Sequence, residues 1–203
     1  MTKQTAPSRS TETRQRILLA AREEIIIHGA AGARVDRIAT LAKTSKERIY
    51  FYFRNKAELV AAVAAEHASS FQNRIDFEEE DVLAFVEAMF DFYCTQKEEV
   101  TLWLRLLLDV GDEEISLDDP RVVWLQQRVE TVRRAQQAGT IDPAWDPIML
   151  LNLLSSLAAS WAIAPVYVNA LREDGTGPQS QQRHRKAVLT IAAQMLKHAP
   201  PAD

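Results

Sequence analysis

Residues 45–53 gather side chains that could contact DNA on the outside of one short helix. Ile49 and Phe53 lie four residues apart, so a helix over residues 46–53 would turn both of them inward. The side chains left outside are hydrogen-bonding groups and amphipathic rings: Lys46, Glu47, Arg48, Tyr50 and Tyr52. In the DNA major groove, such groups donate to guanine, accept from the cytosine amino group and bind flanking phosphates. The stretch therefore predicts a recognition helix, with Arg48 and Lys46 at bases or adjacent phosphates and Glu47 at a cytosine.

A second short helix and a tight turn must position this recognition helix. Before it, apolar residues recur at helical spacing: Val35, Ile38, Ala39, Leu41 and Ala42. Lys43 and Thr44 interrupt the pattern, and Ser45 is a good N-cap for the next helix. This order of helix, turn and helix predicts a helix-turn-helix. The side chains expected mainly to bind phosphates around it are Arg34, Thr44, Tyr50, Tyr52 and Lys56.

The same region resembles the TetR family of transcriptional regulators (TetR/AcrR-like). In that family a Tyr-containing recognition helix ends in an aromatic residue followed by x-[Asn/Ser]-Lys-x-x-Leu, and residues 44–59 here are TSKERIYFYFRNKAEL. Other matching positions are Thr13, Arg14, Gln15, Arg16, Ile17, Leu18, Ala20, Ala21, Gly29, Ile38, Ala39 and Ala42. The likeness covers about residues 13–63. It implies a homodimer on a near-palindromic DNA operator, repression relieved by a small-molecule effector, and a phosphate contact for Lys56.

Several positions depart from the family pattern. Lys43 stands where the turn usually has glycine, so either its backbone is strained at positive φ, at about 1 kcal/mol, or the turn geometry differs. Arg34 replaces the usual Ser or Thr cap of the second helix, which removes a cap hydrogen bond and adds a candidate phosphate ligand. Glu24 stands where an apolar core residue is expected, while Ile26 and Ile27 are apolar where polar residues are common. The first helix therefore either holds a carboxylate at a core position or is rotated by one residue.

Charge is divided unevenly along the 203 residues. Residues 1–60 hold 12 Lys and Arg against 6 Asp and Glu, whereas residues 61–203 hold 12 against 22. The basic first part is typical of a DNA-binding surface, although a solvated basic helix pair would have the same charge. Cys94 is the only cysteine, which excludes an intramolecular disulfide. With no signal peptide pattern at the start, we expect a cytoplasmic protein.

The periodicity predicts an all-α fold of about nine helices. The expected parts are a disordered N-terminal arm (1–11), a helix-turn-helix domain (12–57), a larger helical ligand-binding and dimerisation domain (58–198) and a tail (199–203). Residues 148–171 are expected to form one long helix and residues 183–198 the last helix. The long helix is apolar enough to suggest a membrane span, but its serines, Asn152 and Pro165 argue against one.

The larger domain has more large side chains than a compact helix bundle readily interdigitates. Those expected on inward surfaces are Phe85, Met89, Phe92, Tyr93, Trp103, Leu107, Trp124 and Trp161. As a group they predict a pocket for a mostly apolar or aromatic effector, with Arg105 or Asp91 as polar anchor, although for any one of them a place in the core is the simpler explanation. Dimer contacts are expected on the last two long helices, at Ser155, Ala159, Val188, Ala192 and Met195.

The sequence shows no catalytic or metal-binding pattern. Its histidines are scattered, at His28, His67, His184 and His198, and it has no paired cysteines, P-loop or dinucleotide-binding glycines. We therefore expect a regulator without cofactor or metal rather than an enzyme. The alternatives are a helical interaction module and an all-α enzyme without a sequence signature.

Overall fold

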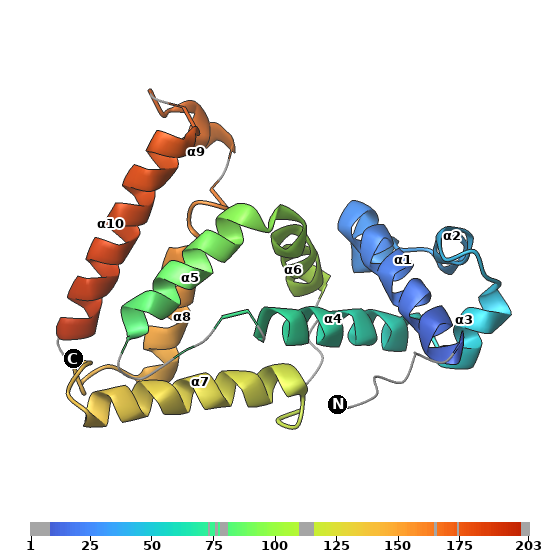
Figure 1. Cartoon of the computed structure of the whole chain (residues 1–203), viewed down its shortest axis with the longest axis horizontal. Coiled ribbons are helices and arrows are strands. Elements are labelled where there is room, and N and C mark those ends of the chain that lie inside the picture. The colour runs from blue at the N-terminus through green and yellow to red at the C-terminus, as the bar shows by residue number, and fades with distance from the viewer. Residues whose placement is uncertain are drawn as a thin grey trace, which may run out of the picture. The chain divides into compact units, whose positions relative to one another are not determined.

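The computed structural model describes residues 9–72, 74–75, 77, 81–109, 116–164, 166–173 and 175–199. Over these ranges the regular structure is entirely α-helical (Figure 1). The helices are α1 (Arg9–Gly32), α2 (Val35–Leu41), α3 (Lys46–Tyr52), α4 (Lys56–Gln72), α5 (Val82–Thr95), α6 (Lys97–Asp109), α7 (Pro120–Gln137), α8 (Pro147–Ala159), α9 (Val166–Ala170) and α10 (Pro178–Lys197). The expected all-α class is confirmed. None of the described helices is long and apolar enough to cross a membrane.

Contacts divide the chain into two compact units. One consists of Met1–Ser70 with Glu98–Glu114, and the other of Phe71–Lys97 with Ile115–Asp203. Most of α4 and α6 therefore groups with the helix-turn-helix. The boundary expected after residue 57 stays a prediction. Of the arm expected over residues 1–11, residues 1–8 lie outside the described residues, and α1 begins at Arg9.

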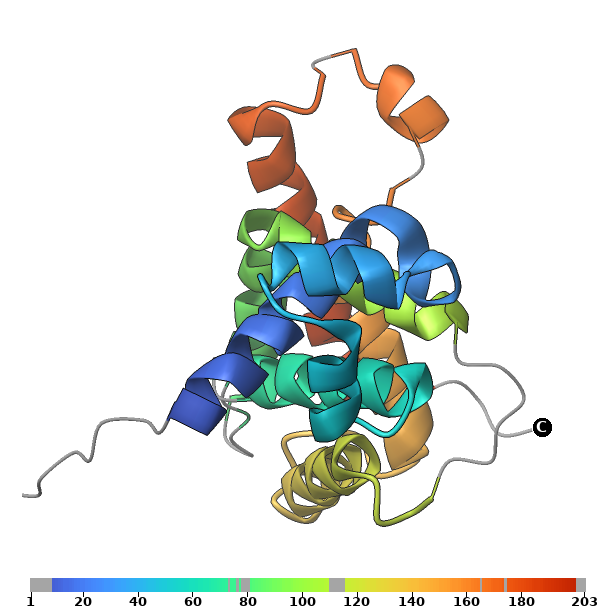
Figure 2. The same ribbon diagram turned by 90° about the vertical axis from the view of Figure 1, so that its right-hand side faces the viewer.

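The first unit is built around one apolar core shared by α1, α2, α3, α4 and α6. In Figure 2, α2 and α3 are drawn in light blue and cyan. The largest fully buried side chains of this core are Ile17, Ile25, Ile38, Ile49, Phe53, Leu59 and Leu102. Burial of Ile49 and Phe53 confirms the predicted orientation of the recognition helix, because it leaves the opposite side of α3 for solvent.

Gly29 interrupts α1 close to its C-terminal end. Its backbone angles are φ 72° and ψ 164°, a conformation open to glycine because it has no Cβ. The chain then makes a further turn to Gly32 before α2 begins.

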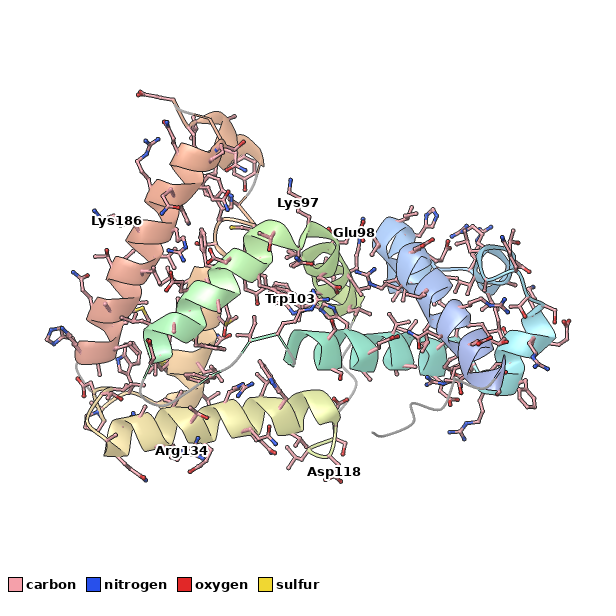
Figure 3. The ribbon with its side chains drawn as sticks, in the orientation of Figure 1. Lys97, Glu98, Trp103, Asp118, Arg134 and Lys186 are labelled. Carbon is pink, nitrogen blue, oxygen red and sulfur yellow. The ribbon has the colours of Figure 1, made fainter. Side chains whose placement is uncertain are left out.

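The second unit packs α5 and α8 together, with α7 against α8 and α10 against both. Phe85, Phe90 and Leu150 are fully buried there. Charged side chains such as Arg134 on α7 and Lys186 on α10 are exposed (Figure 3). This division of apolar and charged faces is what amphipathic helices need to enclose a core.

The prediction of one long helix over residues 148–171 is wrong. Asp146 caps α8 by accepting from the Met149 N–H at 2.8 Å, but the helix ends at Ala159 and turns follow before α9. A proline at position 165 disfavours helical backbone at Ala164, so the apolar run cannot continue as one helix. The last helix also begins earlier than expected, with Gly177 as N-cap and Pro178 in the first turn. The described helices therefore number ten rather than about nine.

Candidate nucleic-acid interface

The turn between α2 and α3 is tight and bent through a residue at positive φ. Lys43 has φ 50°, so the expected strained turn is present rather than a different geometry. The Lys43 N–H donates to Thr40 O at 3.1 Å, and the Thr44 N–H donates to Ala39 O at 2.9 Å. Ser45 then caps α3, because its Oγ accepts from the Arg48 N–H at 3.2 Å. These bonds set the direction in which α3 leaves α2.

The outer side of α3 is rich in exposed aromatic and cationic groups. Tyr50 is 48% exposed and Phe51 is 74% exposed. The sequence interpretation missed Phe51, although it lies about 200° around the helix from buried Ile49, at 100° per residue. That angle was the signal that could have identified it.

Arg48 is held between aromatic rings on this surface. Its guanidinium carbon lies 5.5 Å from the Phe51 ring centroid and 5.7 Å from that of Tyr52. The two rings meet edge to face at 5.2 Å. The Tyr52 hydroxyl lies 3.1 Å from Ser10 Oγ at the start of α1, and this bond lowers the pKa of Tyr52. The Tyr52 ring that contacts Arg48 is therefore positioned in part by α1.

The two lysines expected at DNA are each engaged within the free chain. Lys46 Nζ lies 2.5 Å from Asp36 Oδ1 on α2, and that hydrogen bond raises the pKa of Lys46. Lys56 Nζ donates to Ala31 O at 2.7 Å. Both ammonium groups would have to exchange or share these acceptors with DNA. Hydrogen bonds from the Ser45 hydroxyl and from its own backbone N–H lower the pKa of Glu47, which keeps that exposed carboxylate ionised.

The remaining expected DNA contacts flank α2. Arg34 is exposed, and its side chain makes no cap hydrogen bond, as expected. Thr44 is half-buried in the turn. Glu24 is only 2% exposed, whereas Ile27 is 63% exposed, so the first helix does hold a carboxylate at a core position and is not rotated.

The residues expected around an effector fall in both units. In the second unit, Phe85, Met89 and Tyr93 are buried on α5, where burial raises the pKa of Tyr93 to about 12. The half-buried members there are Phe92, Trp124 and Trp161. In the first unit, Trp103 is half-buried and Leu107 is 54% exposed. Of the two anchors considered, Asp91 is bonded by Arg185 at 2.9 and 3.0 Å, and Arg105 is exposed.

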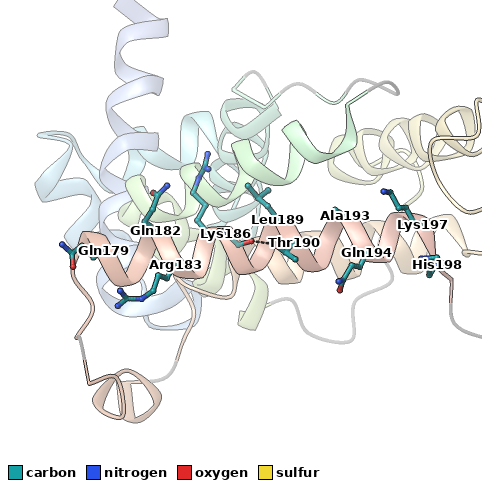
Figure 4. A pocket seen from close by; sticks show the side chains of 11 residues that line it. Gln179, Gln182, Arg183, Lys186, Leu189, Thr190, Ala193, Gln194, Lys197 and His198 are labelled. Carbon is teal, nitrogen blue, oxygen red and sulfur yellow. Dashed lines mark hydrogen bonds between the residues drawn. The ribbon is translucent and has the colours of Figure 1, made fainter.

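A surface groove of about 850 Å³ follows the outer side of α10 (Figure 4). Its lining residues are Gln179, Gln182, Arg183, Arg185, Lys186, Leu189, Thr190, Ala193, Gln194, Lys197 and His198. None of the residues expected around the effector or at the dimer interface lines this groove. It is an open helix face and not an enclosed apolar pocket.

The residues expected at a dimer interface are mostly inside their own unit. Ala159, Val188 and Ala192 are each no more than 2% exposed, and Met195 is half-buried. Ser155 Oγ donates to Leu151 O at 2.8 Å. The apolar side chains that α8 and α10 leave exposed are others: Ile148, Met149, Leu153 and Ile191.

In the described part of the chain, no three His, Cys, Asp or Glu side chains lie together as possible metal ligands. The helix-turn-helix and the helical second unit match known regulators. The family "Bacterial regulatory proteins, tetR family" matches residues 17–63, and "Tetracyclin repressor-like, C-terminal domain" matches residues 81–194.

The chain belongs to the TetR family. Members of this family are transcriptional regulators, so the expectation of a regulator rather than an enzyme is confirmed.

Individual TetR-family relatives agree with this assignment. The transcriptional repressor SCO4008 of Streptomyces coelicolor is 32% identical over 151 residues, which cover 74% of this chain and 78% of the repressor. The regulator SrpR of Pseudomonas putida is 30% identical over an alignment of 211 positions, covering 99% of this chain and 92% of SrpR. Among solved structures, that of a transcriptional regulator, SCO4942 of Streptomyces coelicolor, has a TM-score of 0.75 and 34% identity, covering 90% of this chain and 97% of that one.

FadR of Bacillus subtilis, solved in complex with stearoyl-CoA, shares the fold with a TM-score of 0.64. Its identity is 17%, and the match covers 89% of this chain and 98% of FadR.

Proposed function

We propose that this TetR-family protein is a ligand-controlled repressor that binds a near-palindromic operator as a homodimer. The observation that carries the proposal is the outer surface of α3, where Arg48 stands beside two exposed or half-exposed aromatic rings. A helix that only packs against its neighbours has no need of such a surface. The repressor names of relatives such as SCO4008 support the direction of control. Action on the chromosome places the protein in the cytoplasm.

Each side chain on this surface has a distinct task in the proposal. Arg48 donates to a guanine edge, with Lys46 at a base or neighbouring phosphate and Glu47 at a cytosine amino group. Phe51 adds an apolar contact that suits the C5-methyl group of thymine. The groups that bind phosphates are Arg34, Thr44, Tyr50, Tyr52 and Lys56, and they fix the register of the helix in the groove.

Dimerisation uses the exposed faces of α8 and α10. The large apolar side chains available there are Ile148, Met149, Leu153 and Ile191. Ala159, Val188 and Ala192 are buried on the inner sides of these two helices. A symmetric contact of this kind places two copies of α3 at inverted half-sites.

The effector in this proposal is a mostly apolar or aromatic small molecule that binds to the second unit. The half-buried rings of Phe92, Trp124 and Trp161 offer it apolar surface. FadR shows that this fold holds an acyl-CoA, which is compatible with an apolar ligand. Such a ligand releases the operator because it binds more tightly to the arrangement of the two recognition helices that does not fit DNA. The coupling free energy between ligand binding and DNA binding is roughly 1–3 kcal/mol. DNA then weakens ligand binding by the same factor.

The proposal is tested by selecting duplexes from random DNA with the full chain and measuring the mass of the resulting complex. We expect enrichment of two inverted half-sites, with centres about one helical turn apart or somewhat more, and a complex containing two protein copies. No enrichment over the starting pool would contradict the DNA-binding function. Enrichment of a single half-site by one copy would contradict the dimer. Metabolites that release the selected duplex would then identify the effector.

A further inference from the structure

The first turn of α2 has no cap within its own sequence. Arg34 is the N-cap residue, with φ −118° and ψ 128°, and its side chain makes no cap hydrogen bond. In a capping box, a Glu or Gln at the third helical position accepts from the backbone N–H of the N-cap residue. Here that third position is Arg37, which has donors only. The helix therefore needs an acceptor from elsewhere.

Glu24 on α1 supplies this acceptor. Its Oε1 accepts from the Arg34 backbone N–H at 3.1 Å, which is the same N–H that a capping box would bond. Arg37 donates to the same oxygen, with Nε at 2.6 Å and Nη2 at 2.5 Å. His28, one turn along α1, lies 3.8 Å from the other oxygen. At 2% exposure an unpaired carboxylate would be unstable, so these partners are what allow Glu24 to be ionised there.

We propose that Glu24 is a positioning residue for DNA recognition, which caps α2 from α1 and fixes the direction of α2. This inference rests on the DNA-binding function proposed above. It assigns a role to Glu24, a buried carboxylate at a position where an apolar core residue is expected. It also explains how α2 tolerates arginine at both ends of its first turn.

The first turn of α2 makes polar contacts with both of its neighbouring helices. Arg37 also donates from Nη2 to Gly32 O at 2.9 Å, which closes the connection between α1 and α2. On the same first turn of α2, Asp36 bonds Lys46 at the start of α3. Without Glu24, Arg37 loses its anion and the first turn of α2 loses an acceptor. The helix pair would then have to be ordered during DNA binding, which reduces affinity for a specific site.

A role in folding alone predicts a different result from a role in positioning. Non-specific DNA binding follows net charge, and replacing a glutamate by glutamine makes the first unit more basic. A folded variant that lacked only stability would bind DNA at least as well as the wild type. A variant with a misdirected α2 would bind its operator less well and unrelated DNA no less well.

The direct test compares Glu24→Gln with Glu23→Gln in the full chain. Both remove one negative charge from α1, but Glu23 is exposed. Dissociation constants are measured for the selected operator and for a scrambled duplex, at a temperature where circular dichroism shows each variant folded. We expect Glu24→Gln to lose about tenfold in operator affinity, because a neutral amide accepts more weakly from the Arg34 N–H and leaves Arg37 without its anion, and Glu23→Gln to change it by less than about twofold. Equal operator affinities for the two variants would overturn the inference.

A rescue experiment moves the cap back into α2. The variant Glu24→Leu/Arg34→Ser/Arg37→Gln restores a local capping box and has the same net charge as Arg34→Ser alone. We expect the operator affinities of these two proteins to agree within about threefold. A triple variant that stays about tenfold weaker than Arg34→Ser would overturn the inference, and this comparison decides alone if Glu24→Gln does not fold. Absence of operator preference in the wild type would instead overturn the DNA-binding function itself.

Discussion

Phe51 is the residue on α3 that best separates base recognition from phosphate binding. A phenyl ring gives a phosphate neither charge nor a hydrogen bond, yet this one is 74% exposed beside Arg48. Leaving it in water is unfavourable unless a partner covers it. The apolar group that the major groove offers is the thymine methyl.

Replacing thymine by deoxyuridine in the selected operator tests this contact, because it removes one methyl group and nothing else. At the thymine covered by Phe51, the wild type should lose about fourfold in affinity, the value of one buried methyl group. Phe51→Ala should bind the two duplexes equally. If Phe51→Ala remained as sensitive as the wild type at every thymine, the proposed contact would be wrong.

Lys43 allows a prediction about stability that does not involve DNA. Glycine adopts a φ of 50° without the Cβ clash that lysine has, so Lys43→Gly should raise the free energy of unfolding by up to about 1 kcal/mol. Lys43→Ala removes the same charge but keeps the Cβ, and it should give no such gain. Thermal or urea unfolding of both variants measures the difference, and an equal change in the two would rule out backbone strain at this position.

The residues of the turn were predictable from the sequence because their geometry is local. Lys43 in place of glycine and Arg34 in place of a cap were both recognised as departures, and the structure shows their consequences. The role of Glu24 could not be predicted, since its partners meet it only after the chain has bent at Gly29.

Between elements of the first unit, a polar cluster joins α1, α4 and α6. His67 Nδ1 on α4 lies 2.9 Å from Glu99 Oε2 on α6, and Glu99 Oε1 lies 3.2 Å from Arg22 on α1. Burial lowers the pKa of His67 and outweighs the opposing hydrogen bond to Glu99. The folded protein therefore holds this imidazole neutral, with its N–H directed to a carboxylate.

The cluster predicts a pH dependence of stability. The unfolded chain binds a proton on His67 more readily than the folded protein, so stability is highest above the ordinary pKa of about 6.5 and falls as the pH drops below it. Unfolding by urea between about pH 7.5 and about pH 5.5 should show this loss, and His67→Gln should reduce it. His198→Gln, at an exposed histidine, is the control. A profile for His67→Gln that matched both the wild type and the control would contradict the assignment.

Most elements followed from helical periodicity and capping residues, because both are local properties. Ser45 marks the start of α3 in the structure as it does in the sequence. One helix was predicted across α8 and α9 because the apolar periodicity continues through the break between them. The effect of Pro165 in ending a helix was underestimated. The last helix was expected to begin at residue 183, but α10 begins earlier, with Gly177 as N-cap and Pro178 in the first turn.

At the scale of the whole molecule, the charge distribution sets how binding responds to salt. The net charge is −4, but residues 1–60 are strongly basic, so phosphate contacts are expected from that part alone. The all-α class was predictable from the helical periodicity, and the place of the DNA-binding part was predictable from this asymmetry and from the family resemblance. The effector was not, because its site depends on which large side chains remain accessible after packing.

Lys56 allows a test of the phosphate contacts through salt. Operator affinity should fall steeply as salt rises, and Lys56→Gln should lower the slope of log affinity against log salt by roughly one per half-site. Arg133→Gln on α7 removes the same charge from the second unit and should leave the slope unchanged. Equal slopes for all three proteins would exclude a phosphate contact for Lys56.

The central claim, that the outer face of α3 recognises DNA sequence, is tested most directly at Arg48. Competition between the selected operator and a scrambled duplex, at fixed salt, gives the specificity ratio for the wild type, Arg48→Ala and the charge-matched control Arg133→Ala. We predict that Arg48→Ala reduces this ratio by about tenfold or more, as expected for losing a guanine contact of roughly 1–3 kcal/mol, while Arg133→Ala preserves it. A folded Arg48→Ala variant with the specificity ratio of the wild type would contradict the account.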